Sequence, residues 1–164
     1  MKYFEMGGVL RALQSTDNAL GNYIAYYTKN GLLINPSIPA GLWGVFMETI
    51  QEGDMILGDG MLRTVEQTIQ IVQKMRDKER SFVVICLEIP DEEVYKRVAK
   101  RVNADGSQAR KDDMDEKAIR NRIEAFHRDT EPALQWLKEQ GVLVSVDGMR
   151  SEVEIFEEIL KIVA

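Results

Sequence analysis

A segment centred on Asp59 combines residue types that can bind phosphate and a metal ion. Asp59, Gly60 and Arg63 follow a short apolar run, and ligands of α/β proteins bind at the ends of such strands. Asp59 can hold a water molecule bound to Mg²⁺, and Arg63 can donate two hydrogen bonds to one phosphate group. The alternative is an ordinary Asp-Gly turn followed by an arginine at a helix start. On this segment alone, the two interpretations carry equal weight.

A second group consists of arginines on both sides of a segment with turn chemistry, residues 103–108. The group comprises Arg97, Arg101, Arg110, Arg120 and Arg122. Arg97 and Arg101 share one helical face, whereas Arg120 and Arg122 point in nearly opposite directions around a helix. Any one of them can be a solvated charge paired with a neighbouring glutamate. Because the whole chain carries a net charge of -6, the clustering favours an anion clamp that forms when the segment closes.

The elements that would position these residues alternate between strand and helix, which predicts the α/β class with a parallel sheet and crossover helices. The expected strands are residues 2–5, 55–57, 82–88 and 142–146. The last two are nearly continuous apolar runs, typical of strands buried on both faces. Two helices carry apolar stripes that we expect to be core: Val94, Val98 and Val102, and Val153, Phe156, Ile159 and Leu160.

The fifty or so residues between the first two strands exceed one crossover helix and predict a helical insertion. Its helices are expected near residues 8–14, 17–29 and 37–50. A later helix, starting near Met114, contains Pro132, which removes a backbone hydrogen bond and should kink or restart it.

Composition restricts the class of protein. The 164 residues fit one domain, and no apolar run approaches the roughly 20 residues that span a bilayer. The N-terminus has no signal-peptide pattern, so we expect a cytoplasmic protein without a membrane partner. Cys86 is the only cysteine and lies in an apolar run, where burial is expected. The acidic balance argues against nucleic acid as a partner.

The order and spacing of several motifs resemble the adenylate kinases, a family of nucleoside monophosphate kinases. The motifs are Gly7-Gly8-Val9-Leu10-Arg11-Ala12, Asp59-Gly60-x-x-Arg63-Thr64-x-x-Gln67, Arg110-Lys111-Asp112-Asp113 and Ile119-Arg120-Asn121-Arg122. The resemblance covers essentially the whole chain. It implies a P-loop kinase-like three-layer fold, with a single domain over residues 1–164, a helical insertion for the nucleoside monophosphate at 6–50 and a short lid at 102–112.

The resemblance also implies a role for each matching residue in reversible phosphoryl transfer from ATP to AMP. Arg11 and Arg63 would hold the acceptor phosphate, Gln67 would hydrogen-bond the base, and backbone at Leu32, Leu33, Ile34 and Gly60 would line the base pocket. Asp59 would support Mg²⁺ through water. Arg97, Arg101 and Arg150 would contact ATP, and Arg101, Arg110 and Arg122 would act on the transferred phosphate when the lid closes. Arg120 receives no role.

The short lid, with eight residues between Arg101 and Arg110, resembles the branch of the family that carries no cysteine-bound zinc. We therefore expect ATP, AMP and Mg²⁺ as ligands, no zinc, and a monomer. His127 lies on the long helix without a neighbouring nucleophile, so we expect no catalytic role for it. Trp43 and Trp136 are expected to be packing residues.

The sequence departs from the family pattern in two ways. Met6, Gly8 and Leu62 stand where the resemblance expects a hydroxyl residue, an aspartate and a proline. Met6 removes a hydroxyl expected near the acceptor base, which leaves the base open between AMP and another nucleoside monophosphate, and Leu62 removes a fixed turn that helps to orient Arg63. The family's central first strand and P-loop, about 25 residues, have no match in this chain. We expect unpaired strands around the missing centre and little turnover. The alternatives are a non-catalytic nucleotide-binding module and a fragment of such a kinase.

Overall fold

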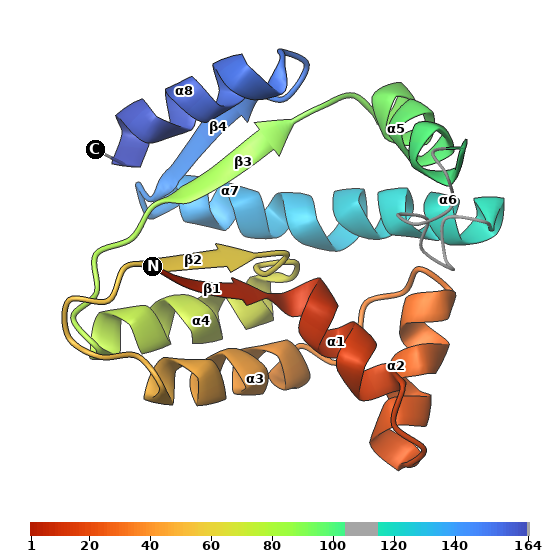
Figure 1. Ribbon diagram of the computed structural model, residues 1–164, viewed down its shortest axis with the longest axis horizontal. Helices are drawn as coiled ribbons and strands as arrows, with labels where there is room; N and C mark the ends of the chain where they lie inside the picture. The colour runs from red at the N-terminus through yellow and green to blue at the C-terminus, as the bar shows by residue number, and fades with distance from the viewer. Residues whose placement is uncertain (104–114, 164) are drawn as a thin grey trace.

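The computed structural model describes the backbone of residues 1–103 and 115–163, and the side chains of residues 1–100 and 115–163 (Figure 1). Strands and helices alternate along the chain, which confirms the α/β class. In chain order the elements are β1 (Lys2–Glu5), α1 (Met6–Gln14), α2 (Ala19–Lys29), α3 (Ser37–Glu48), β2 (Ile56–Asp59), α4 (Val65–Asp77), β3 (Val84–Glu88), α5 (Asp91–Asn103), α6 (Glu116–Ala125), the π-helical turn η2 (Phe126–Thr130), α7 (Glu131–Glu139), β4 (Leu143–Asp147) and α8 (Glu152–Val163).

The four strands form two separate parallel ladders. β1 pairs with β2 from Lys2↔Ile56 to Glu5↔Asp59, and β3 pairs with β4 from Val84↔Leu143 to Glu88↔Asp147. Among the described residues no ladder joins β2 to β3. This arrangement agrees with the expectation that the two pairs flank an unfilled centre. Each of β2 and β3 therefore presents one edge of backbone groups outside any described ladder.

The aromatic and methionine side chains on one face of the first ladder form its core. Phe4 is 7% exposed, and its ring lies 5.4 Å from Trp43 and 4.9 Å from Phe46. Helices α3 and α4 cover this face (Figure 1) and contribute further buried side chains such as Met47 and Ile71. This core fixes the end of β1, from which α1 starts directly.

The helix that carries Pro132 runs between the two ladders. The expected interruption is confirmed, because α6 ends at Ala125, η2 follows, and α7 restarts with Pro132 in its first turn. Proline cannot donate a backbone hydrogen bond, which favours the wider turn just before it. α7 contacts both α4 and β4, and its Leu137 is fully buried, so this helix joins the two halves of the molecule.

Two expectations about the core of the second half are wrong. β3 is not buried on both faces, since Leu87 is 49% exposed, and the stripe on α8 is not core, since Phe156 is 60% exposed. β3 has a ladder partner on one side only, and the main neighbour of α8 is β4, so neither element is covered by a second layer of described residues. On α5, Val98 is buried as expected, whereas the side chain of Val102 lies outside the described residues. Within the described chain, no helix has the length and apolarity to cross a bilayer.

Candidate functional site

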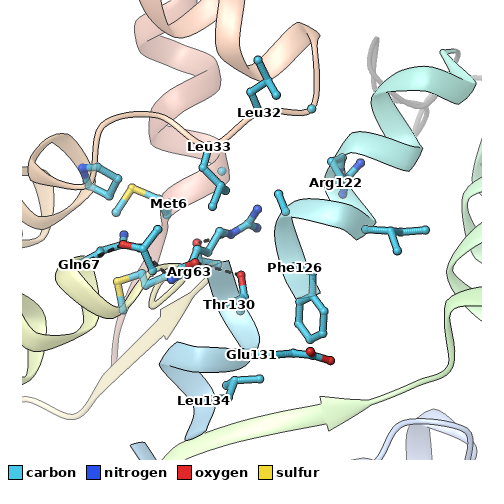
Figure 2. Close-up of a pocket in the computed structure, with 18 of the residues that line it drawn as sticks. Met6, Leu32, Leu33, Arg63, Gln67, Arg122, Phe126, Thr130, Glu131 and Leu134 are labelled. Carbon is cyan, nitrogen blue, oxygen red and sulfur yellow. Dashed lines mark hydrogen bonds between the residues drawn. The ribbon is translucent and has the colours of Figure 1, made fainter. Parts of the chain in front are cut away.

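A large open cavity of about 1730 Å³ lies between the two halves of the fold (Figure 2). It receives residues from the carboxyl ends of β1, β2 and β3, from the loop after α2, and from α6, η2 and α7. Ligand sites in α/β proteins occur at such strand ends. The volume exceeds that of an ordinary pocket for one small molecule.

One wall of the cavity is apolar. It is built from the segment after α2 and from the start of α1 and α3, with Met6, Leu33, Ile34, Pro36 and Pro39 among its residues. Met6 and Ile34 are buried, 3% and 8% exposed. Such a wall suits the face of a planar base, because it removes the ring from water without requiring polar partners.

The loop after β2 brings Arg63 to the cavity. Gly60 and Leu62 both adopt left-handed backbone conformations, with φ of 73° and 63°. The Arg63 Nε donates to the carbonyl oxygen of Gly60 at 3.2 Å, and its side chain extends into the space between Leu33 and Phe126 (Figure 2). A proline, whose φ is fixed near -65°, cannot occupy position 62 in this loop. The loop therefore orients Arg63 through left-handed backbone conformations at Gly60 and Leu62, and not through the proline that the resemblance expects at position 62.

We predict that Leu62→Pro destabilises the protein more than Leu62→Ala does. Both variants lose the packing of the leucine side chain, but only proline forbids the left-handed conformation, at a cost of about 2 kcal/mol or more. Urea unfolding of the two variants measures the difference. Equal unfolding midpoints would show that the loop does not need a positive φ at this position.

Gln67 and Thr64 begin helix α4 and hold the same loop. The Thr64 hydroxyl oxygen accepts from the Gln67 backbone N–H at 3.2 Å, and the Gln67 Oε1 accepts from the Arg63 backbone N–H at 2.8 Å. This reciprocal pattern resembles a capping box. Gln67 is 3% exposed, lines the cavity, and has its amide oxygen already engaged. Its side chain therefore combines a structural role with a position suitable for contact with a base.

Two carboxylates lie side by side at the ends of β1 and β2. Glu5 and Asp59 are register partners in the parallel ladder. Glu5 Oε1 accepts from Arg11 Nη2 at 2.6 Å, and Asp59 Oδ2 accepts from the Tyr3 hydroxyl at 3.2 Å. Arg11 lines the cavity, whereas Asp59 lies just behind Gly60 and is not part of the lining. Across the part of the chain that the structure describes, no group of three or more His, Cys, Asp or Glu side chains has an arrangement that could hold a metal ion.

The opposite side of the cavity is formed by α6, η2 and α7. Arg122 and Phe126 line it, and Figure 2 shows both on this helical side of the cavity, with the Phe126 ring near Glu131. The Thr130 hydroxyl donates to the carbonyl oxygen of Arg63 at 3.0 Å. Through this bond the π-helical turn contacts the loop that carries the arginine.

His127 of the same turn connects to α5 and α7. Its Nε2 lies 2.9 Å from an Asp91 carboxylate oxygen, and its Nδ1 lies 2.8 Å from Glu131 Oε1. Hydrogen bonds to Asp91 and then to Glu131 raise the pKa of His127 above its ordinary value near 6.5. The protonated imidazole can donate to both carboxylates at once. His127 therefore holds the start of α5 against the long helix.

We predict that the stability contributed by His127 depends on pH. Because its pKa is higher in the folded state, the contribution is complete below about pH 6.5 and is lost as the pH rises through the folded-state pKa. His127→Gln should therefore lower the urea midpoint at pH 6 more than at pH 8.5. An equal loss at the two pH values would show that the charge of the imidazole does not matter.

The arginines predicted to contact ATP and the transferred phosphate do not all lie at the cavity, unlike the residues predicted for the acceptor site. Arg97 donates to the Gly148 carbonyl oxygen at 2.7 Å and pairs with Glu93, and Arg150 forms an ion pair with Glu158 on α8. Neither arginine lines the cavity. The side chain of Arg101, all of Arg110 and most of the expected lid at 102–112 lie outside the described residues.

Sequence reasoning missed Thr130 and treated His127 only as a residue without a catalytic role. Both belong to the turn before Pro132, so the predicted break in this helix was the available signal. Their partners, Arg63 and Asp91, are 67 and 36 residues away in the sequence. Cys86 is half-buried on β3 rather than enclosed, and partial burial raises the pKa of its thiol. Trp43 is buried as a packing residue, and Trp136 is partly buried.

The fold and this cavity define an α/β protein with arginines gathered at the ends of parallel strands. No family model matches the chain. It is 31% identical to an adenylate kinase of Leptospira biflexa over 159 residues, covering 94% of this chain and 82% of that protein. An adenylate kinase of Methanosarcina barkeri is 30% identical, with 93% and 82% covered, and one of Thermus thermophilus is 28% identical, with 88% and 79% covered. This chain belongs to the adenylate kinase family.

Proposed function

We propose that the cavity binds a nucleoside monophosphate, with AMP as the first candidate, as the acceptor of a phosphoryl group from ATP. One observation carries the proposal: every residue expected at the acceptor site lines the same cavity. These residues are Arg11, Leu32, Leu33, Ile34, Gly60, Arg63 and Gln67. They come from three separate segments of the chain, residues 11, 32–34 and 60–67, so sequence proximity does not account for the convergence of these segments.

In this proposal the base lies against the apolar wall that contains Leu33 and Ile34, within reach of the Gln67 side chain. The phosphate binds to the guanidinium groups of Arg63 and Arg11, which donate hydrogen bonds to its oxygens. Residues 6–50, which contain α1 to α3, would act as the acceptor-binding insertion. Met6, which is buried in the wall, offers no hydroxyl to the base, so other nucleoside monophosphates are part of the test.

Arg97, Arg101 and Arg150 would contact the donor triphosphate, and Arg101, Arg110 and Arg122 would stabilise the charge of the transferred group. Phosphoryl transfer needs positioned positive charge more than covalent chemistry, which suits a set of arginines. Arg122 lines the cavity opposite Arg63 and supports this assignment (Figure 2). The segment 102–112 would act as the lid that excludes water.

Mg²⁺ fits the site as an ion carried by nucleotide phosphates. Mg²⁺ in such sites keeps several waters and needs only one or two carboxylates, so Asp59, which is exposed at the end of β2 and precedes the lining residue Gly60 without lining the cavity itself, would act through a bound water. The ion would neutralise phosphate charge when bound. The donor set offers no cysteine cluster, because Cys86 is the only cysteine, and we propose no zinc. We further propose a cytoplasmic monomer that binds nucleotides and neither nucleic acid nor membranes.

A second candidate function is a nucleotide-binding module without efficient transfer. The 164 residues contain no glycine-rich segment followed by Lys and Ser or Thr, which would supply backbone N–H groups and a lysine for donor phosphates.

Two measurements on the 164-residue chain separate these functions. Calorimetric titration with AMP, CMP, UMP and GMP tests the acceptor site, and a coupled assay of ADP formed from ATP and AMP with Mg²⁺ tests transfer. We expect AMP binding with turnover well below the roughly 1 to 1000 per second of ordinary enzymes. Turnover within that range would reject the second candidate, and no binding of any nucleotide would reject both.

A further inference from the structure

The guanidinium of Arg11 is occupied by a carboxylate of its own chain. Glu5 Oε1 lies 2.6 Å from Arg11 Nη2, a short charge-assisted contact. Glu5 is the last residue of β1, and Arg11 lies on α1, one and a half turns into the helix that begins at Met6. The pair therefore spans the start of α1 at the cavity, where Gly7 and Arg11 belong to the lining.

Two glycines make room for this pair. A Cβ atom added at Gly7 would lie 2.9 Å from Arg11 Nη1, and one added at Gly8 would lie 2.9 Å from Glu5 Oε2. Any side chain at either position would press on the paired groups. Gly8 also stands where the family resemblance leads us to expect an aspartate, and the carboxylate that contacts Arg11 in this chain is that of Glu5. The two glycines and Glu5 together define the local arrangement.

A phosphate and the Glu5 carboxylate compete for the same donor atoms. Both are anions that accept hydrogen bonds from a guanidinium. Because the Glu5 carboxylate belongs to the same chain, its effective concentration next to Arg11 is high. Exposure of the two side chains, 44% for Arg11 and 34% for Glu5, leaves the pair accessible to an incoming ligand. An exposed ion pair is weak enough to be exchanged for a better partner. Asp59, the register partner of Glu5, adds a second negative charge nearby.

We propose that Glu5 is a specificity-determining residue that acts through Arg11: a ligand phosphate binds by displacing the Glu5 carboxylate. This inference rests on the proposed function of the cavity and adds a prediction about ligand charge. The penalty from Glu5 should grow with the negative charge that the ligand places near Arg11. The affinity for AMP, which is nearly a dianion at pH 7.5, should be reduced by the full penalty, whereas the affinity for adenosine, which has no phosphate, should not be reduced.

The test is calorimetric titration of the wild type and Glu5→Gln with AMP and with adenosine. Glu5→Gln should bind AMP about three- to ten-fold more tightly, because it keeps the size of the side chain and removes its charge. Adenosine affinity should stay the same, which a general change in structure would not produce. Glu48→Gln is the matched control, since Glu48 also forms an exposed ion pair, with Lys78, and does not line the cavity.

A second variant tests the route through Arg11. In an Arg11→Ala background, the gain from Glu5→Gln should be smaller than in the wild type. Equal or weaker AMP binding by Glu5→Gln, in a wild type that binds AMP, would overturn the inference and leave the proposed function standing. A parallel gain for adenosine would also overturn it. Absence of binding of AMP, CMP, UMP and GMP to both proteins would overturn the proposed function and this inference together.

Discussion

Arg63→Ala should weaken AMP binding by about 100-fold. Hydrogen bonds to charged groups contribute roughly 1.5 to 3 kcal/mol, and a fork of two bonds to one phosphate lies at or above the upper end of this range. The side chain of Arg63 reaches into the cavity from a loop that the Thr130 hydroxyl and the Gln67 amide both hold. The loss should therefore come from the missing guanidinium and not from a reorganised loop. Calorimetric titration with AMP measures it.

Two further variants make this result specific. Arg63→Lys keeps the charge but cannot form the planar fork, so its affinity should lie between those of the wild type and the alanine variant. Arg120→Ala is the matched control, because Arg120 is exposed, pairs with Glu116 on its own helix, and does not line the cavity. Its AMP affinity should equal that of the wild type. A comparable loss in Arg120→Ala would mean that net charge, and not the position of Arg63, governs binding.

The residues proposed for the acceptor side of the cavity could be singled out from the sequence because they lie in short motifs with local signals. The apolar run before Asp59, the Asp-Gly turn and the helix start after Arg63 place this arginine at a strand end without any knowledge of the rest of the fold. The structure adds what the motif did not state: the Thr64 hydroxyl oxygen accepts from the Gln67 backbone N–H, and the Gln67 side chain accepts from the Arg63 backbone N–H. The left-handed conformation of Leu62 was not predictable, because leucine gives no sign of a positive φ.

The wrong predictions of burial for β3 and α8, in the second half of the chain, have a different origin. An apolar run such as residues 82–88 becomes a buried strand only if other strands and helices cover both of its faces. The sequence of the run does not indicate how many strands the sheet contains. β3 has one ladder partner within the described chain, so Leu87 stays half exposed. The roles of Thr130 and His127 depend on contacts across 67 and 36 residues. Such contacts depend on how α6, η2 and α7 cross the molecule, which short motifs do not reveal.

Trp43→Ala should cause the largest loss of stability among simple substitutions in the first half. The indole is 2% exposed, packs edge-on against Phe4 with ring centroids 5.4 Å apart, and packs in a tilted arrangement against Phe46 at 5.3 Å. Removing a buried aromatic side chain leaves a cavity and costs about 3 to 5 kcal/mol, a large part of the stability of an ordinary domain. Urea unfolding followed by circular dichroism measures the change.

Trp43→Phe separates packing from polarity at the same position. Among the described atoms, the indole Nε1 of Trp43 is buried without a hydrogen-bond partner, so phenylalanine keeps an aromatic contact and removes an unsatisfied donor. It should cost less than about 1.5 kcal/mol. Equal losses for alanine and phenylalanine would show that the ring contacts with Phe4 and Phe46 do not stabilise the fold.

The same two variants test how the core supports the site. Phe4 packs on Trp43 and is followed directly by Glu5 and Met6, so a loosened core should also release the end of β1 and the start of α1. AMP titration in the absence of denaturant should then show weaker binding for Trp43→Ala than for Trp43→Phe, even where both proteins remain folded. Equal affinity in the two folded variants would mean that the loop after β2, with Arg63 and Gln67, fixes the acceptor geometry without help from β1.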